Sequence, residues 1–295
     1  MNLKKSLELF LKGMAMGAAD VVPGVSGGTI ALISGIYPKL LDAISNIKPS
    51  LLSELSNKGF AFVAEKIHLK FLITLFAGIF ASVLTLAKGI SYLLEFHPIL
   101  IWSFFLGLIL GSILLMVKQI KGKRSLVIIA GLFGMLLAAG VSFLPVGEDA
   151  STLPYLFLSG ALAICAMILP GISGSFILVI LGSYEPILQA VHQRDLKTIA
   201  VVGAGAIIGL LSFARILKWF FHRYPNATLA LMTGFIAGSI PAVWPWKDNA
   251  SGGLYLPSLG LDSDQLLLAI LLSLLGLFLI IGLEKVSKLG TQTRL

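Results

Sequence analysis

The fold is decided by the stretch VVPGVSGGTIALISGIYPKLLDA at residues 21–43, because a second part of the chain repeats it. Residues 168–190, ILPGISGSFILVILGSYEPILQA, match it without gaps. The residues that interrupt the apolar pattern are Pro23 and Gly24 in the first copy and Pro170 and Gly171 in the second. Proline removes a backbone donor and glycine weakens a helix, so both copies predict a broken helix.

A second pair of segments repeats in the same order. Residues 77–113 match residues 204–240 without gaps, and both segments contain the tripeptide GSI near their ends. The order of the two matches predicts that the chain consists of two homologous halves, which we place at residues 1–146 and 147–295.

The composition identifies an integral membrane protein. Of 295 residues, 57% are hydrophobic and 12% are charged, and the mean hydropathy is +0.96. A helix needs roughly 20 apolar residues to cross a bilayer. The uncharged stretches that meet this requirement are Phe71 to Ala87, Pro98 to Val117, Leu126 to Leu144, Thr198 to Ala214, Pro225 to Trp246 and Leu266 to Leu283.

The interrupted segments, at about 8–45 and 154–191, predict re-entrant helical hairpins whose arms are too short to cross; full crossings stay open as the alternative. Each half then contains one hairpin and three spans, at about 70–146 in the first half and 197–285 in the second. Because this number of crossings is odd under either interpretation, the second half is inverted relative to the first. The expected fold is an all-α integral membrane protein with two inverted-topology repeats.

Basic residues give the orientation. With the N-terminus inside, the outer loops keep only Arg194, Lys197 and Lys247 of the loop cations, which is the positive-inside pattern. Both termini are therefore expected in the cytoplasm. The net charge of +8 has the same explanation, so we expect membrane lipids as partners and no nucleic acid.

Broken helices in inverted repeats are typical of secondary transporters, whose substrates bind near the midplane. Each second arm begins directly after the break, so its first N–H groups favour an anion. The candidate binding residues at the breaks are Ser26, Gly27, Gly28, Thr29, Ser173, Gly174 and Ser175. The alternative is that Pro-Gly only turns the hairpin and the serines cap the next helix.

Two cations lie inside predicted spans. Lys88 and Arg215 occupy corresponding positions in the matching segments 77–113 and 204–240, and each follows 17 uncharged residues. A charge inside a span is costly and marks a functional site by default, so both are candidates for substrate binding. The alternative is that the two side chains reach toward the nearer interface.

Two carboxylates have no acidic counterpart in the other half. Asp20 corresponds to Met167, and Glu185 corresponds to Pro38. Either acid can carry a coupling proton or pair with a base, and simple neutralising pairing is the alternative. No motif of a metalloenzyme, nucleotide hydrolase or serine hydrolase is present, so we expect no enzyme, metal or cofactor.

The two motifs resemble a known membrane family. GAADVVPGVSGGTIALISGIY and ILPGISGSFILVILGSYEPIL are similar to the polyprenyl-phosphate transporters of the PopT type. The resemblance implies that undecaprenyl phosphate returns from the outer to the cytoplasmic leaflet of a bacterial plasma membrane for carrier-lipid recycling. It implies the phosphate lipid; the residues alone predict only an inverted-repeat transporter for an anion.

Three alternatives to lipid-phosphate transport remain at this point. One is transport of a small soluble anion, the second is an intramembrane lipid-phosphate phosphatase, and the third is a membrane scaffold. The phosphatase lacks a His and Asp constellation for its chemistry. A homo-oligomer is compatible with the sequence, which does not fix the oligomeric state.

Overall fold

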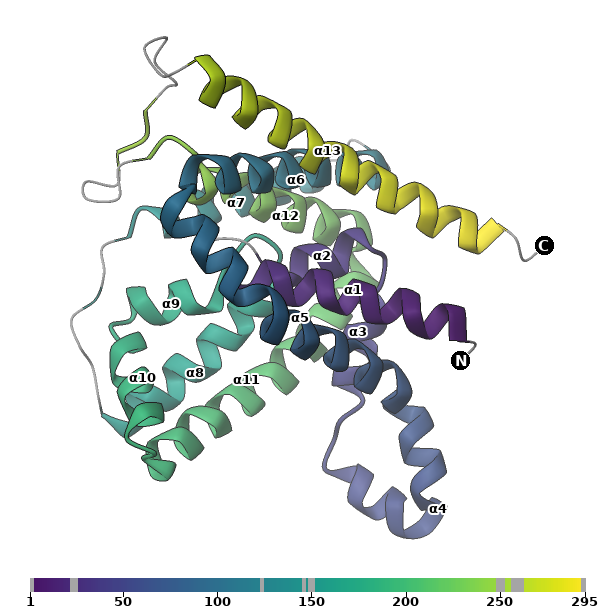
Figure 1. The fold of residues 1–295 in the computed structure, drawn as a ribbon. Helices are drawn as coiled ribbons and strands as arrows, with labels where there is room; N and C mark the ends of the chain where they lie inside the picture. Colours follow the sequence, from purple (N-terminus) through teal and green to yellow (C-terminus); the bar gives the residue numbers. More distant parts are fainter. Residues whose placement is uncertain are drawn as a thin grey trace.

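A computed structural model describes residues 3–21, 26–122, 125–144, 147, 152–247, 253–255 and 263–292. Its regular elements within these ranges are helices and one isolated β-bridge (Figure 1). The helices of the first half are α1 (Leu3–Val21), α2 (Gly27–Ile33), α3 (Tyr37–Ser45), α4 (Ser50–Lys66), α5 (Leu69–Phe96), α6 (Pro98–Gln119) and α7 (Ser125–Ser142). Those of the second half are α8 (Leu153–Ile168), α9 (Gly174–Ile180), α10 (Tyr184–His192), α11 (Leu196–Arg223), α12 (Pro225–Gly238), the 3₁₀ helix η1 (Ile240–Val243) and α13 (Ser263–Gln292).

The chain is a multi-pass membrane protein. Within the described ranges, six helical segments are long and apolar enough to cross a bilayer: α5, α6, α7, α11, α12 with η1, and α13. These are the six predicted spans. Several of them extend beyond the uncharged stretches: α5 continues to Phe96, α11 to Arg223 and α13 to Gln292.

The second arm of each predicted hairpin consists of two short helices. In the first half α2 is followed by α3, and in the second half α9 is followed by α10. Gly35 and Gly182, which correspond in the repeat, separate these pairs with φ of 74° and 62°. Such a left-handed conformation favours glycine. In the second half the two helices are bent by 108° relative to each other.

Glycines bring α1 close to α5 and α8 close to α11 (Figure 1). A Cβ atom at Gly78 would overlap the carbonyl oxygen of Phe10, and one at Gly205 would overlap that of Phe157. These two contacts join corresponding residues of the two halves. The small residues of the segments FAGIFAS (76–82) and GAGAIIG (203–209) thus allow this close approach of the helices.

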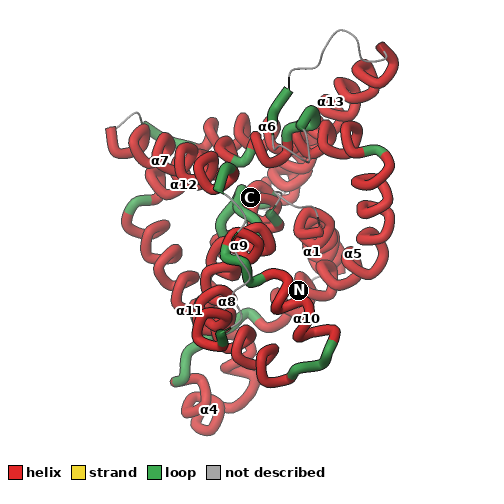
Figure 2. Tube along the Cα trace, turned by 90° about the vertical axis from the view of Figure 1, so that its left-hand side faces the viewer, coloured by secondary structure: helices red, strands yellow, loops and turns green. Residues whose placement is uncertain are grey.

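The last two helices of each half pack across to the other half. Helix α6 packs against α13, and α12 packs against α7, as the upper part of Figure 2 shows. Gly107 lies against the carbonyl of Ser273, and its counterpart Gly234 lies against the carbonyl of Gly131. The cross-half packing thus repeats the pattern of the sequence duplication.

The segment 46–70 connects the first hairpin to α5 and is partly helical. It contains the helix α4, which projects away from the other helices in Figure 1 and has a break at Gly59, where φ is 80°. Large apolar side chains such as Leu52 and Phe60 are exposed on it. The buried core lies elsewhere, between the hairpins and the spans.

Candidate functional site

The two helix breaks lie against each other. The Ser26 hydroxyl is 3.2 Å from the carbonyl oxygens of both Met167 and Leu169, to which it can donate. In the other direction, the N–H of Gly171 donates to the Thr29 hydroxyl over 3.0 Å. Residues about 140 positions apart in the chain therefore form one site.

A buried tyrosine supports this contact. Tyr37 is fully buried, and its hydroxyl donates to the carbonyl oxygen of Ile168 over 3.0 Å. Its counterpart Tyr184 is exposed. The first tyrosine therefore holds the second break in place, whereas the second has no comparable role.

A cavity of about 130 Å³ lies where the breaks meet. This volume can hold several water molecules, so it is large enough for a tetrahedral phosphate group. We call it the central cavity, and the residues that line it are Asp20, Ser26, Met167, Ile172, Ser173, Gly174 and Ser175. Ser26 and Ser173, the corresponding serines of the two motifs, face the same space.

The first N–H groups of α2 already have acceptors. The Asp20 carboxylate accepts from Gly27 N over 2.7 Å, and the Ser26 hydroxyl accepts from Gly28 N over 3.1 Å. Thr29 N donates to the carbonyl oxygen of Ser26. The Asp20 carboxylate therefore occupies the start of α2, where the sequence predicts that a substrate anion binds.

The start of α9 differs. Met167 stands where the first half has Asp20, and no side chain in the described part of the protein caps the first N–H groups of this helix. The hydroxyls of Ser173 and Ser175 lie 2.9 Å apart beside these groups. Because α9 has only seven residues, its dipole adds little, and the donors themselves are what an anion can use.

The two candidate cations lie in different surroundings. Arg215 donates from Nη2 to the carbonyl oxygen of Ile47 over 2.7 Å, and its Nε lies 3.5 Å from that of Ser45. Lys88 is exposed on α5. Neither side chain lines the central cavity, so the structure does not bring these cations together with the two breaks.

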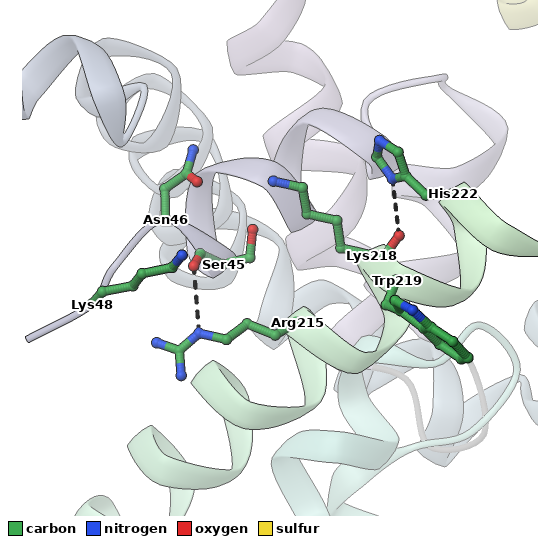
Figure 3. Close-up of a pocket in the computed structure, with 7 residues that line it drawn as sticks. All are labelled: Ser45, Asn46, Lys48, Arg215, Lys218, Trp219 and His222. Carbon is green, nitrogen blue, oxygen red and sulfur yellow. Dashed lines mark hydrogen bonds between the residues drawn. The ribbon is translucent and has the colours of Figure 1, made fainter.

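Arg215 lines a second cavity, of about 360 Å³ (Figure 3). We call it the α3–α11 cavity, and its lining residues are Ser45, Asn46, Lys48, Arg215, Lys218, Trp219 and His222. Of these residues, only Arg215 is predicted from the sequence. The spacing of the α11 members along one helix face is a signal in the sequence, but nothing there places Lys48 beside them.

The remaining predicted residues have local surroundings. Glu185 accepts a hydrogen bond from the Gln189 amide on the exposed surface of α10. Pro170 is fully buried and Gly171 has φ of 82°, so both form the second break. Pro23 and Gly24 lie outside the described residues. Among the described residues, no group of three or more His, Cys, Asp or Glu side chains is placed to hold a metal ion.

Comparison with known proteins decides the family. The model of a family described as undecaprenyl phosphate translocase-like matches residues 16–254. The chain belongs to this family. It is 47% identical to a polyprenyl-phosphate transporter of Vibrio cholerae, over 95% of this chain and 96% of the relative. It is also 34% identical to one of Staphylococcus aureus, over 80% and 85% of the two chains.

The undecaprenyl phosphate translocase-like match includes both helix breaks and both cavities. The two relatives are named as transporters, not as enzymes. No solved structure is significantly similar to the chain.

Proposed function

We propose that this protein is a translocase that moves undecaprenyl phosphate from the outer to the cytoplasmic leaflet of a bacterial plasma membrane, so that the carrier lipid is reused. Family membership supports a polyprenyl phosphate as the substrate. The single structural observation that carries the proposal is the central cavity, where two broken helices meet and uncapped donors line one wall.

We infer that the halves are inverted repeats, with both termini in the cytoplasm. The matched packing of α1 on α5 and of α8 on α11 supports the duplication. The reciprocal packing of α6 on α13 and α12 on α7 supports an approximate two-fold relation between the halves. The odd number of crossings in each half makes this relation an inversion across the membrane.

The phosphate is proposed to bind on the α9 side of the central cavity. There the N–H groups of Gly174 and Ser175 and the hydroxyls of Ser173 and Ser175 are its donors. At the corresponding place in the first half, the Asp20 carboxylate binds Gly27 N. The protein therefore contains its own example of an anion held by this motif, and Met167 leaves the second place open for a substrate.

The remaining candidates fill supporting roles in this proposal. Ser26, Gly28 and Thr29 hold the second break by direct contact, since a Cβ atom at Gly28 would lie 2.6 Å from the carbonyl oxygen of Ile168. Arg215 and Lys88 attract the phosphate near the two membrane surfaces. The polyprenyl tail stays in the lipid, because it has no polar group to bury.

Asp20 is the proposed site of a coupling proton. Asp20 is the one carboxylic acid among the described residues that line the central cavity. A bound phosphate places a second negative charge in the same small cavity, and like charges disfavour each other in such surroundings. Protonation of Asp20 removes this repulsion, so a proton accompanies the phosphate.

Leaflet exchange in proteoliposomes tests the function. Labelled undecaprenyl phosphate is placed in both leaflets, and its accessibility to an external phosphatase is followed in time. We expect two kinetic phases with the protein and one in its absence. Exchange no faster than in protein-free vesicles, together with uptake of inorganic phosphate or a carboxylate, would instead indicate a transporter of soluble anions.

A further inference from the structure

We propose that the α3–α11 cavity is a second binding site for a phosphate monoester, separate from the central cavity. The inference rests on the proposed function, because the same phosphate would bind here after it has passed the central cavity. The cavity of about 360 Å³ is larger than the central one. It is open to the surface, since Lys48, Trp219 and His222 are exposed.

Two elements build the wall of this cavity. Arg215, Lys218, Trp219 and His222 recur along α11 at the spacing of one helix face, and Figure 3 shows Lys218 and His222 on the upper side of that helix and Arg215 reaching toward Ser45. The segment after α3 provides the opposite wall, from Ser45 to Lys48. Helix α3 packs directly on α11, so the two walls are fixed relative to each other.

The charges in the cavity do not balance. Lys218 is paired with Asp42, which also lies 3.0 Å from Nε2 of His68. The Lys218 ammonium beside Asp42 and the His68 ring hold the pKa of that carboxyl group below its usual range. Asp42 does not line the cavity, and its negative charge is balanced by Lys218. It therefore does not neutralise the other two cations of the cavity, Arg215 and Lys48.

Arg215 and Lys48 carry the unbalanced charge. Arg215 hydrogen-bonds backbone carbonyl groups, which bear no net charge. The Lys48 side chain makes no hydrogen bond or close ion pair within the described ranges; it attracts Glu54 only at longer range, and Glu54 is already paired with Lys66. Two positive charges thus face one cavity without an acid, and a phosphate monoester carries about −1.5 to −2 at neutral pH. The guanidinium group still has free N–H donors for the phosphate oxygens.

The duplication shows that this site exists in one half only. The first match ends at residues 43 and 190; continued without a gap it places Lys48 opposite Asp195, which caps α11 by accepting from Lys197 N and Thr198 N. Lys88, the counterpart of Arg215, lines neither cavity. The charge pattern places the α3–α11 cavity on the cytoplasmic side, where a phosphate that has passed the central cavity leaves the protein.

Calorimetry on the full chain in nanodiscs tests this inference. The probes are inorganic phosphate, a short prenyl monophosphate and the corresponding uncharged prenol. The measurement uses Met167→Asp as the background, because a carboxylate beside α9 blocks the central cavity. Both phosphate probes are expected to bind, and the prenol is not. Binding of the prenyl phosphate alone would show that the site takes a lipid headgroup with its chain, and equal binding of both would show that the phosphate is sufficient.

Lys48→Gln is the decisive variant, because the Lys48 side chain makes no hydrogen bond or close ion pair in the described structure and acts on Glu54 only at longer range. We expect its affinity for phosphate to fall about tenfold, the loss of one charge-assisted hydrogen bond. Arg215→Lys, which retains the charge but not the fork, should lose less. Lys197→Gln removes one exposed charge from the other end of α11 and should bind as the background does.

The location of the ligand has its own readout. Phosphate should change the fluorescence of Trp219, and Trp219→Phe should remove that change. Unchanged affinity in Lys48→Gln, or no binding at millimolar phosphate, would overturn the inference. Neither result bears on the proposed function, which fails only when the wild-type protein does not accelerate leaflet exchange.

Discussion

The two helix breaks have nearly the same sequence but different chemistry. In the first, Asp20 binds Gly27 N and Ser26 binds Gly28 N, so the start of α2 is satisfied within the protein. In the second, Met167 replaces the acid and no described side chain caps the start of α9. A duplicated motif thus serves as structure in one half and, in our proposal, as a substrate site in the other.

The largest expected effect comes from making the second break resemble the first. In Met167→Asp, a carboxylate would take the N–H groups of α9 and exclude the phosphate. We expect leaflet exchange of polyprenyl phosphate to slow by about 100-fold, corresponding to ~3 kcal/mol of lost binding. Met167→Leu is the matched control and should transport normally. Full transport by the aspartate variant would place the phosphate elsewhere.

The opposite change should act on stability. Asp20→Ala leaves Gly27 N without its acceptor, and an unsatisfied buried group costs about 1–3 kcal/mol. Thermal unfolding in detergent should therefore occur at a lower temperature. Met167→Ala, at the corresponding position, removes no hydrogen bond of this kind and should be milder. Equal melting temperatures for the two variants would contradict the claim that only the first break depends on an acid for its stability.

The glycine contacts test where the halves are alike. Gly78→Ala and Gly205→Ala each force a methyl group against a carbonyl oxygen, and we expect a loss of about 1–3 kcal/mol for both. Gly89→Ala and Gly203→Ala face open space on the same two helices and should be neutral or slightly stabilising. Strongly unequal effects at Gly78 and Gly205 would contradict equivalent packing.

A pH series tests the proposed coupling proton. If protonated Asp20 accompanies the phosphate, leaflet exchange should slow as the pH rises from 6 to 8 in the wild type. Asp20→Asn keeps an acceptor for Gly27 N but cannot titrate, so its exchange rate should not change with pH in this range. An identical pH profile for both proteins would exclude Asp20 as the coupling group.

The corresponding serines should show the smallest effects, and different ones. Ser26→Ala removes contacts to the second break and should lower the melting temperature. Ser173→Ala removes a donor from the cavity wall and should slow exchange about threefold, with little change in stability. Slower exchange in Ser26→Ala together with a lower melting temperature in Ser173→Ala would mean that the substrate binds at the first break and not at the second.

Much of this arrangement could be predicted from the sequence. Hydropathy identifies the six spans, and the gapless repeat identifies both breaks and the serines beside them. Asp20 was visible as an acid without a counterpart. Its role was not, because the hydrogen bond from Gly27 N to Asp20 joins two different helices, α1 and α2, and no local sequence pattern predicts such a contact.

The α3–α11 cavity shows the same limit over a longer range. Arg215 looked like an isolated charge within a span, and its contacts with Ser45 and Ile47 join residues about 170 positions apart. Such contacts follow from the packing of α3 on α11, which no local pattern predicts. Helix α4 was missed for another reason, since its polar composition and Gly59 are typical of a loop.

The central claim is that the substrate phosphate binds at the second break and not at the first. The most direct test is an experimental structure of the wild-type protein with bound polyprenyl phosphate. We predict phosphate density within hydrogen-bonding distance of the N–H groups of Gly174 and Ser175, with Asp20 still bound to Gly27. Density at the start of α2 in place of the Asp20 carboxylate, or a central cavity that stays empty while the lipid binds elsewhere, would contradict the account.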